Sequence, residues 1–381
     1  VKYYHYSFTN IAQHIYVIEA DLNNPNVEVA TVISDDTVPN PNIIGTNNGK
    51  KERETLSETC ERRIAEGQNI IAGINTGFFD TTHGIPRGFH IEEGRPDFIN
   101  NPDVRSRLTN HAPGFTFFKD RSLGFGRRGF EGFIKIGDES FEYYSINDTI
   151  VINTCPDYQA NLYTARLKQN PHEGVSVNVS SNALFITARN DQVLQVNEGW
   201  FTATVTDVVD GRNAASITVP YVNDNRDWVL QVTGEKADQI KNKVSKGDQV
   251  EIRADVFLDG DRSTGPILTQ NASMYRFLYN GSFSRPAATD EPYPATLAGA
   301  DEPNSKIYWI AIDGRSTASR GLTYYQAYRV GKKLGCYNLI RFDGGGSTTM
   351  WVRDEGGVVN VPSDTGGERS CMNYFHLRIK N

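Results

Sequence analysis

The chain has few of the residues that mark metal, redox or membrane proteins. Its 381 residues include four cysteines, seven histidines and three methionines. The cysteines form no C-x-x-C pair and the histidines are scattered, so we predict no zinc site, no dinuclear metal centre and no cofactor. No apolar run approaches the roughly 18 to 20 residues that cross a bilayer, so no membrane span is expected.

Positive charge is also in short supply. The chain has 39 Lys and Arg against 46 Asp and Glu, a formal net charge of -7 at pH 7. Binding to a phosphate backbone needs a basic surface, so no nucleic-acid partner is expected. An anionic ligand must then be held by a local group of positive side chains and not by the overall field.

The four cysteines, Cys60, Cys155, Cys336 and Cys371, are widely spaced. They fit either two disulfides of a secreted protein or four buried thiols. Buried thiols are slightly favoured, because a chain of this length does not need covalent cross-links to fold. The sequence starts at Val1 without Met, which fits removal of an N-terminal segment.

Glycine is abundant, and three of the 34 glycines are consecutive. Residues 338–352 read Asn-Leu-Ile-Arg-Phe-Asp-Gly-Gly-Gly-Ser-Thr-Thr-Met-Trp-Val. This pattern predicts a strand, a tight turn and a second strand. The turn places Asp343, Gly344, Gly345, Gly346, Ser347, Thr348 and Thr349 at the rim of a sheet.

Consecutive glycines indicate a backbone with positive φ or one that closely approaches another group. Their N–H groups, with the hydroxyls that follow, are suited to an anion. The alternative is a plain flexible hairpin turn. The stretch matches neither a Walker loop, which needs Gly-Lys-Ser/Thr, nor the spaced glycines of a dinucleotide fold.

A second carboxylate follows another apolar strand, since residues 307–312 lead into Asp313. Between the two strands, residues 323–334 have a helical pattern, with Thr323 as N-cap and Gly335 as C-cap. A strand, a helix and a second strand resemble a βαβ unit. Asp313 and Asp343 would then emerge at the same sheet edge, where α/β proteins place ligands.

Other polar residues follow glycine-containing turns. The apolar strand 69–74 ends at Asn75, and Arg87 lies in the next turn; Arg315 and Arg369 lie near the other turns. Arginine binds phosphate through two parallel hydrogen bonds, and a carboxylate beside it stays ionised and able to act as nucleophile or base. The alternative is that these groups form structural ion pairs at strand ends.

The predicted fold class is α+β, mixed and sheet-rich with few helices. Short β-prone segments recur between residues 113 and 229 at the spacing typical of antiparallel sheets. Residues 15–20 and 27–32 predict two further strands near the N-terminus. We predict an N-terminal extension over residues 1–55 and one domain over residues 56–381.

The segment 343–350, Asp-Gly-Gly-Gly-Ser-Thr-Thr-Met, resembles the signature of the phosphodiester glycosidase family, whose substrates are N-acetylglucosamine-1-phosphodiesters. Four further segments resemble family motifs and occur in the same order: 74–79, 312–315, 321–323, and 359–364 followed by Glu368-Arg369. The resemblance covers about residues 60 to 381, and the first 55 residues lie outside it.

The resemblance implies a hydrolase that breaks the bond between the anomeric carbon of a sugar and a phosphate oxygen. The expected catalytic residues are Asp343, which acts on the anomeric carbon or on its water, and Asp313, the second carboxylate. Substrate binding is assigned to Asn75, Arg87, Arg315, Gly344, Gly345, Gly346, Ser347, Thr348 and Arg369. Family habit further implies a secreted, periplasmic or cell-surface protein.

Two positions depart from the family pattern. Ala295 stands where the family commonly has an arginine, and Gln326 stands at a helix position that is usually acidic. Two alternatives therefore remain. One is a carbohydrate-binding surface protein that kept the cleft and lost catalysis, and the other is a phosphodiesterase that cuts on the phosphorus side.

Overall fold

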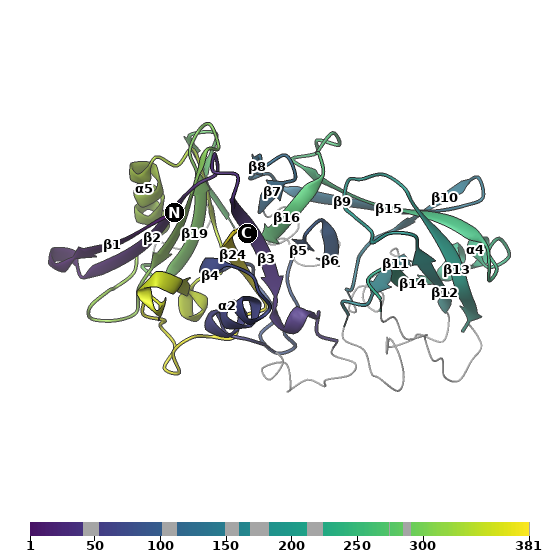
Figure 1. The fold of residues 1–381 in the computed structure, drawn as a ribbon, viewed down its shortest axis with the longest axis horizontal. Coiled ribbons are helices and arrows are strands. Elements are labelled where there is room, and N and C mark those ends of the chain that lie inside the picture. The colour runs from purple at the N-terminus through teal and green to yellow at the C-terminus, as the bar shows by residue number, and fades with distance from the viewer. Residues whose placement is uncertain are drawn as a thin grey trace.

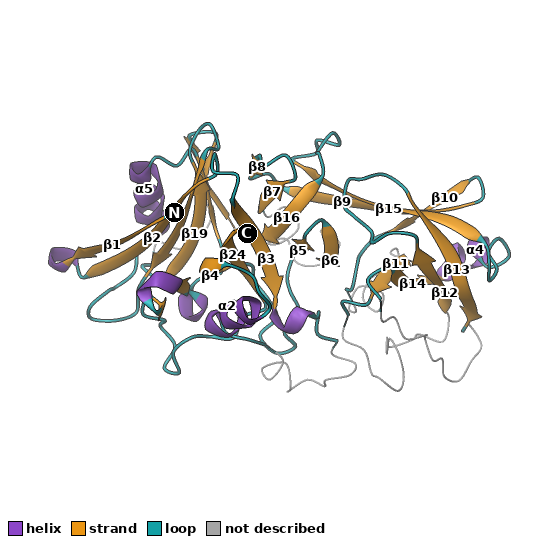
Figure 2. Ribbon diagram, viewed as in Figure 1, coloured by secondary structure: helices purple, strands orange, loops and turns teal. Residues whose placement is uncertain are grey.

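A computed structural model describes residues 1–40, 53–100, 113–148, 160–167, 183–211, 224–273, 275–284 and 291–380. The molecule is elongated, with two sheets and the chain termini in one half and a large curved sheet in the other (Figure 1). Strands dominate and the helices lie at the periphery (Figure 2). The predicted sheet-rich α+β class is confirmed.

Two sheets pack face to face in the half that contains the termini. Sheet A has the order β1 (Lys2–Phe8), β2 (Gln13–Asp21), β20 (Lys306–Ile312), β19 (Ala295–Ala300), β21 (Asn338–Arg341), β17 (Tyr275–Tyr279) and β18 (Ser282–Phe283). Sheet B has the order β23 (Gly357–Val358), β22 (Met350–Val352), β4 (Ile70–Asn75), β24 (Asn373–Ile379) and β3 (Val27–Ile33).

The middle of the chain forms the other two sheets. Sheet C has the order β6 (Arg95–Ile99), β5 (Phe89–Glu92), β16 (Ile267–Ala272), β7 (Gly114–Phe118) and β8 (Leu123–Gly124). Sheet D has the order β10 (Glu139–Tyr143), β9 (Arg128–Ile136), β15 (Gln249–Leu258), β13 (Phe201–Asp210), β12 (Ala183–Asn190), β14 (Asp227–Thr233) and β11 (Ala160–Thr164).

The α-helices of the described ranges are α2 (Leu56–Ala65), α4 (Gly234–Ile240) and α5 (Tyr324–Leu334), and short 3-10 turns are η1 (Thr9–Ile11), η2 (Ser34–Asp36), η3 (Gly345–Ser347) and η4 (Arg353–Glu355). Helix α5 begins and ends as its sequence predicts. Thr323 forms a capping box with Gln326, and Gly335 closes the helix with φ of 95°. Gln326 is thus used in capping the helix.

The two carboxylate-bearing strands are parallel to each other but do not pair. Strand β19 lies between β20 and β21 and is antiparallel to both. The expected βαβ unit is therefore split by an inserted strand. The consequence for the site is unchanged, because β20 and β21 still end at the same edge of sheet A.

Apolar side chains fill the space between the sheets. Trp309 of β20 stacks on Phe375 of β24, with ring centroids 6.1 Å apart, in the core between sheets A and B. The opposite face of sheet A packs against α5 through residues such as Ile310 and Ala327. Sheet D wraps around a separate core that includes Ile186 and Trp228. Sheet A is thus packed on both faces, which fixes the edge where β20 and β21 end.

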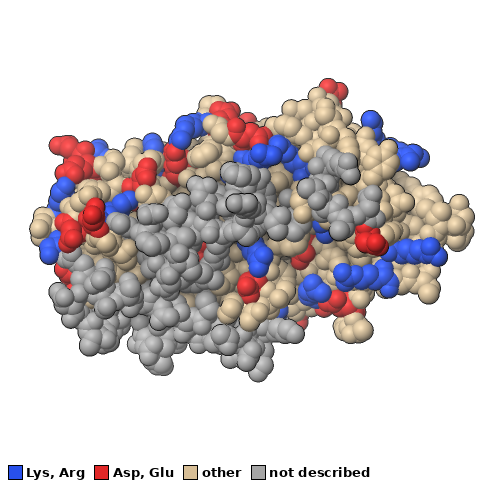
Figure 3. All heavy atoms as spheres, turned by 180° about the vertical axis from the view of Figure 1, so that it is seen from behind, with Lys and Arg blue, Asp and Glu red and all other residues tan. Residues whose placement is uncertain are grey.

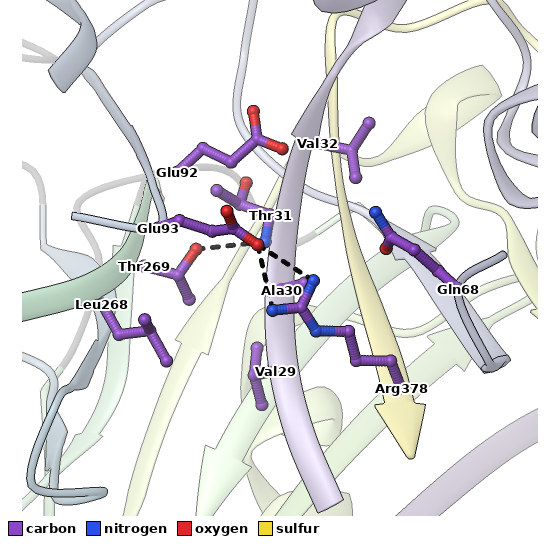
Figure 4. Close-up of a pocket in the computed structure, with 10 residues that line it drawn as sticks. All are labelled: Val29, Ala30, Thr31, Val32, Gln68, Glu92, Glu93, Leu268, Thr269 and Arg378. Carbon is purple, nitrogen blue, oxygen red and sulfur yellow. Dashed lines mark hydrogen bonds and ion pairs between the residues drawn. The ribbon is translucent and has the colours of Figure 1, made fainter. Parts of the chain in front are cut away.

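Strand β3 joins sheet B to sheet C. The Thr31 N–H donates to Thr269 Oγ1 of β16 at 3.0 Å, and Arg378 pairs with Glu93 at 3.1 Å beside it (Figure 4). The crevice drawn there has a volume of about 10 Å³. That is room for a single water at most. The seam is therefore a packed structural joint and not a ligand site.

The N-terminal strands are built into both sheets of this half. Within the described residues 1–40, β2 pairs with β20 and β3 pairs with β24, while β1 adds an edge strand to β2 that the sequence did not indicate. The boundary predicted at residue 55 stays a prediction. The segment before it nevertheless supplies strands to sheets A and B.

The described cysteines are buried, and charges of both signs are mixed on the surface. Cys60, Cys336 and Cys371 are free, buried thiols, as favoured, and Cys155 lies outside the described residues. Lys and Arg are interspersed with Asp and Glu over the described part of the face seen in Figure 3. No helix in the described ranges is both long and apolar enough to cross a membrane.

Candidate active site

The glycine turn, residues 343–349, links two sheets. It leaves β21 in sheet A, passes through η3 and enters β22 in sheet B. Gly345 has φ of 63°, the left-handed conformation that glycine adopts without strain. A hairpin would pair its two flanking strands with each other, so the plain hairpin alternative is wrong for this turn.

Charged side chains lie close to the glycines of the turn, in the space that a Cβ on Gly345 or Gly346 would occupy. A Cβ on Gly346 would fall 1.9 Å from Asp364 Oδ1 and 2.2 Å from Arg369 Nη2. A Cβ on Gly345 would fall 3.0 Å from Arg315 Nη2. The glycines are needed because two arginines and a carboxylate occupy that space.

Asp343 is the half-buried carboxylate at the start of the turn. Its Oδ1 accepts from the Gly344 N–H at 2.9 Å and its Oδ2 accepts from the Ser347 hydroxyl at 2.7 Å. Arg369 donates to Ser347 Oγ at 3.2 Å and pairs with Asp364 at 2.8 Å. A chain of charge-assisted hydrogen bonds thus runs from Arg369 to Asp343.

A second guanidinium lies beneath the turn. Arg341 is 7% exposed and donates to Tyr324 Oη at 2.8 Å. Its guanidinium carbon lies 4.3 Å from the centroid of the Tyr293 ring. Burial raises the pKa of Asp343, while Ser347, the Gly344 N–H, Arg341 and Arg369 lower it in part. The two arginines therefore favour the ionised carboxylate.

Asp313 lies at the end of β20 and is only 3% exposed. Its Oδ1 accepts from Asn360 Nδ2 at 3.2 Å and from the Val361 N–H at 3.0 Å. Burial raises the pKa of Asp313, while Asn360, the Val361 N–H and the Tyr16 hydroxyl, followed by His14, oppose the rise. Its surroundings are therefore mainly neutral donors.

Asn360 connects the two carboxylates. Its Nδ2 also donates to the Thr348 carbonyl at 3.0 Å, and its Oδ1 accepts from the Met350 N–H at 2.7 Å. The turn residue Ser347, next to Thr348, contacts Asp343. Asp313 and Asp343 are thus held by neighbouring residues of one segment, as a shared site requires.

Asn75 braces this arrangement from sheet B. Its amide donates to the Asp343 carbonyl at 2.9 Å, and its oxygen accepts from Thr296 Oγ1 and from the Thr349 N–H. It is 1% exposed. Asn75 therefore lies next to Asp343, and its hydrogen bonds fix the backbone there. Its contact with substrate stays a prediction.

The N–H groups of the turn are largely used within the protein. The N–H groups of Gly344, Gly345, Ser347 and Thr348 donate to protein oxygens. The hydroxyls of Thr348 and Thr349 are buried without a hydrogen-bond partner in the described residues. Buried hydroxyls are normally paired. In this conformation an anion would therefore meet Arg369, Arg315 and Thr348 more readily than a nest of backbone N–H groups.

Arg315 and Arg87 occupy the margins. Arg315, exposed and with φ of 62°, lies against Gly345. Arg87 is exposed in the loop after β4, and no hydrogen bond or ion pair joins its side chain to the carboxylates in the described ranges. Ala295 is 1% exposed on β19 between the carboxylate strands and packs in the core with α5. Its position is filled by apolar contacts.

Sequence reasoning missed the contribution of the N-terminal hairpin, β1 and β2. Gln13 donates to the Asp313 carbonyl at 3.0 Å, across 300 residues of chain, and Asp313 N–H donates to the His14 carbonyl at 3.2 Å. The Tyr16 hydroxyl lowers the pKa of the carboxylate. Alternation of apolar and polar residues revealed strand β2, but no local signal tells which strand it pairs with.

One cluster in the described residues has the composition of a metal site. His90, Glu92 and Asp97 of sheet C are buried, with ligand atoms within 4.8 Å of one another. Arg95 pairs with both carboxylates, at 3.2 Å to Glu92 and 2.5 Å to Asp97, and Arg166 contacts them too. These guanidinium groups balance the negative charge, so we assign the cluster a structural role.

Comparison with known proteins bears on the family and the fold. Residues 190–378 match the phosphodiester glycosidase family. The match includes both carboxylates and the glycine turn, and it begins later than the predicted resemblance, so that Asn75 and the N-terminal hairpin lie outside it. No curated protein sequence matches the chain.

Solved structures share the fold at low sequence identity. A hypothetical protein from Synechocystis has a TM-score of 0.66 at 12% identity, over 99% of this chain and 61% of that one. A candidate exported protein from Burkholderia pseudomallei K96243 has a TM-score of 0.62 at 17% identity, over 96% and 74%. The chain thus spans about three fifths of the Synechocystis protein.

The zebrafish N-acetylglucosamine-1-phosphodiester alpha-N-acetylglucosaminidase catalytic domain, auto-inhibited by its pro-peptide, has 14% identity over 100% of this chain and 82% of that one. Its TM-score of 0.43 supports no conclusion about this fold.

Proposed function

Because residues 190–378 belong to the phosphodiester glycosidase family, we propose that this protein hydrolyses a sugar-1-phosphodiester to free sugar and a phosphomonoester. The substrate class we propose is an N-acetylglucosamine-1-phosphodiester. The reaction breaks the bond between the anomeric carbon and the phosphate oxygen. Water supplies the new oxygen on carbon, and the phosphomonoester leaves with the bonding electrons.

Asp343 is the proposed reacting carboxylate. It is the more exposed of the two, and Gly344 and Ser347 orient its two oxygens. The neighbouring arginines favour its ionised form. An ionised carboxylate at this position can take the proton of the attacking water or attack the anomeric carbon itself.

Arg369 and Arg315 are the proposed partners of the phosphate. A phosphomonoester is already a good leaving group, so stabilising its negative charge matters more than protonating it. Both guanidinium groups lie against the glycine turn, within reach of the space beside Asp343. Thr348, with its unpaired hydroxyl, and Arg87 complete the proposed binding residues.

Asp313 is the proposed second carboxylate. It is deeply buried and surrounded by neutral donors, so it is suited to stabilising positive charge on the sugar ring. This role needs no direct bond to the substrate. The observation that carries the whole proposal is that Asp343 and Asp313 share one sheet edge, joined through the turn and Asn360.

The test is incubation of the purified protein with N-acetylglucosamine-1-phosphate joined to the 6-hydroxyl of a mannoside. Free sugar from the wild type, and none from Asp343→Asn, would support the proposal. Sugar-1-phosphate as the product would move cleavage to phosphorus. Absence of any product from a panel of diesters would overturn the proposal in favour of a binding protein.

One observation favours that second candidate, a carbohydrate-binding surface protein without catalysis. Ala295 leaves the centre of the site edge without a cation on β19. Binding of the diester without turnover would support it. For either function we propose a secreted, periplasmic or cell-surface location, which the name of the Burkholderia neighbour parallels.

A further inference from the structure

The N-terminal hairpin covers the Asp313 side of the site. Strand β2 pairs with β20 in register, Ile15 opposite Ile312, which places His14 beside Asp313. The side chain of Gln13, 2% exposed, donates to the Asp313 carbonyl and accepts from the Gly321 N–H at 3.1 Å. The backbone of Asp313 is therefore fixed by residues that precede the family match by more than a hundred and fifty positions.

Side chains of the hairpin continue this cover over the carboxylate. Tyr16, 5% exposed, lies opposite Ala311 in the pairing of β2 with β20, so its side chain is on the same face of sheet A as Asp313 and within diagonal reach of it. The His5 ring stacks on Tyr16 with centroids 4.4 Å apart and planes 9° apart, and His5 Nε2 lies 3.0 Å from His14 Nδ1. The His5 ring thus holds the Tyr16 ring from one side, and the Tyr16 hydroxyl lowers the pKa of Asp313.

From these contacts we propose that Tyr16 is a positioning residue for Asp313, held in place by the His5–His14 pair of the same hairpin. This inference deepens the proposed function and rests on Asp313 being its second carboxylate. One Asp313 oxygen is oriented by Asn360 and Val361, which follow β23 of sheet B, and Tyr16 approaches the carboxylate from β2 of sheet A, the sheet that contains Asp313.

The electrostatic consequence has a definite sign. A donor to the ionised form lowers the pKa of a carboxylate, so loss of the Tyr16 hydroxyl raises the pKa of Asp313. The groups that face Asp313 are Tyr3 from β1, His14 and Tyr16 from β2, and Asn360 and Val361 from the loop after β23. Further out, Glu355 of η4 faces Tyr3. Apart from Tyr16, all of them remain in Tyr16→Phe.

The experiment uses the full chain with ¹³C-labelled aspartate, and Asp313→Asn identifies the Asp313 resonance. Tyr16→Phe is compared with Tyr6→Phe, a matched control. Tyr6 alternates to the opposite face of β1 and is 38% exposed. We expect the pKa of Asp313 to rise by about one unit in Tyr16→Phe and to stay unchanged in Tyr6→Phe.

A pKa of Asp313 that is the same in Tyr16→Phe and in the wild type overturns the inference. His5→Ala provides a second variant that leaves the hydroxyl in place and removes its clamp, and a smaller rise is expected there. The titration needs no substrate. A failure of this inference can therefore be distinguished from a failure of the proposed hydrolysis. If the wild type also hydrolyses the diester, the limb of its pH–rate profile set by Asp313 moves to higher pH in Tyr16→Phe.

Discussion

The two carboxylates of the site lie at one sheet edge but in different surroundings. Asp343 is half-buried and is linked to Arg369 through Ser347, with Arg341 beneath. Asp313 is 3% exposed and receives hydrogen bonds from Asn360 and a backbone N–H, and the Tyr16 hydroxyl also lowers its pKa. Cations stabilise a negative charge at Asp343, whereas neutral donors mainly orient Asp313.

This difference indicates a division of labour. A carboxylate that must react needs access to substrate and neighbours that support its charge, and Asp343 is partly exposed and has two arginines that oppose the rise of its pKa on burial. A carboxylate that stabilises charge at a distance needs only a fixed position in a dry environment, which suits Asp313. The same chemical group thus has two proposed roles because the fold surrounds it differently.

The largest effect is expected for Asp343→Asn. Removal of the reacting carboxylate should lower kcat on the order of 10⁴-fold, at the upper end of the range for acid–base groups. The measurement is free sugar released from the diester. Asp354→Asn is the control, because its side chain is 90% exposed on η4. Equal activity of Asp343→Asn and the wild type would remove Asp343 from the mechanism.

The next effect is expected for Gly346→Ala. The added Cβ meets Asp364 and Arg369 at 1.9 and 2.2 Å, so that ion pair must move away from the turn. A displacement of this size should lower kcat/KM on the order of 10²-fold. Gly366→Ala is the matched control, since a Cβ there meets nothing within 4 Å. Wild-type activity in both variants would contradict the role of Arg369.

Asp313→Asn should have a smaller effect than either, about tenfold in kcat and below the range of direct acid–base catalysis. Asparagine keeps the size of the side chain but removes its charge. A thermal melt run alongside would show whether the fold is retained. A loss as large as that of Asp343→Asn would contradict the division of labour between the two residues.

The smallest effect is a pH shift that acts on one carboxylate alone. Arg369→Gln removes a positive charge that lowers the pKa of Asp343, so that pKa should rise, and the corresponding limb of the pH–rate profile should move to higher pH. Arg369→Lys keeps the charge and should leave the limb in place. A shift of the Asp313 resonance in Arg369→Gln would show that the two environments are not independent.

Local features of the site were predictable from sequence. The strand ends before Asp313 and Asp343, the glycine turn, and helix α5 with its caps at Thr323 and Gly335 each rest on residues close together in the chain. Turn and cap chemistry acts over a few residues, so a single sequence contains the signal.

The remaining features depend on partners far apart in the chain. Sequence alternation does not say that β19 inserts between β20 and β21, or that the glycine turn crosses from one sheet to the other. It also does not reveal that Gln13 and Tyr16 meet Asp313, about 300 positions away. Strand pairing is set by the packing of the whole core, so the local sequence contains little information about which strands pair.

The central claim is cleavage at the anomeric carbon, and hydrolysis of the diester in ¹⁸O-labelled water tests it most directly. The account predicts that the label appears at the anomeric hydroxyl of the free sugar, with none in the phosphomonoester. The free sugar must be analysed at once, before its anomeric oxygen exchanges with the solvent. Label in the phosphate group, with sugar-1-phosphate or the phosphomonoester carrying it, would contradict the account and place the bond cleavage at phosphorus.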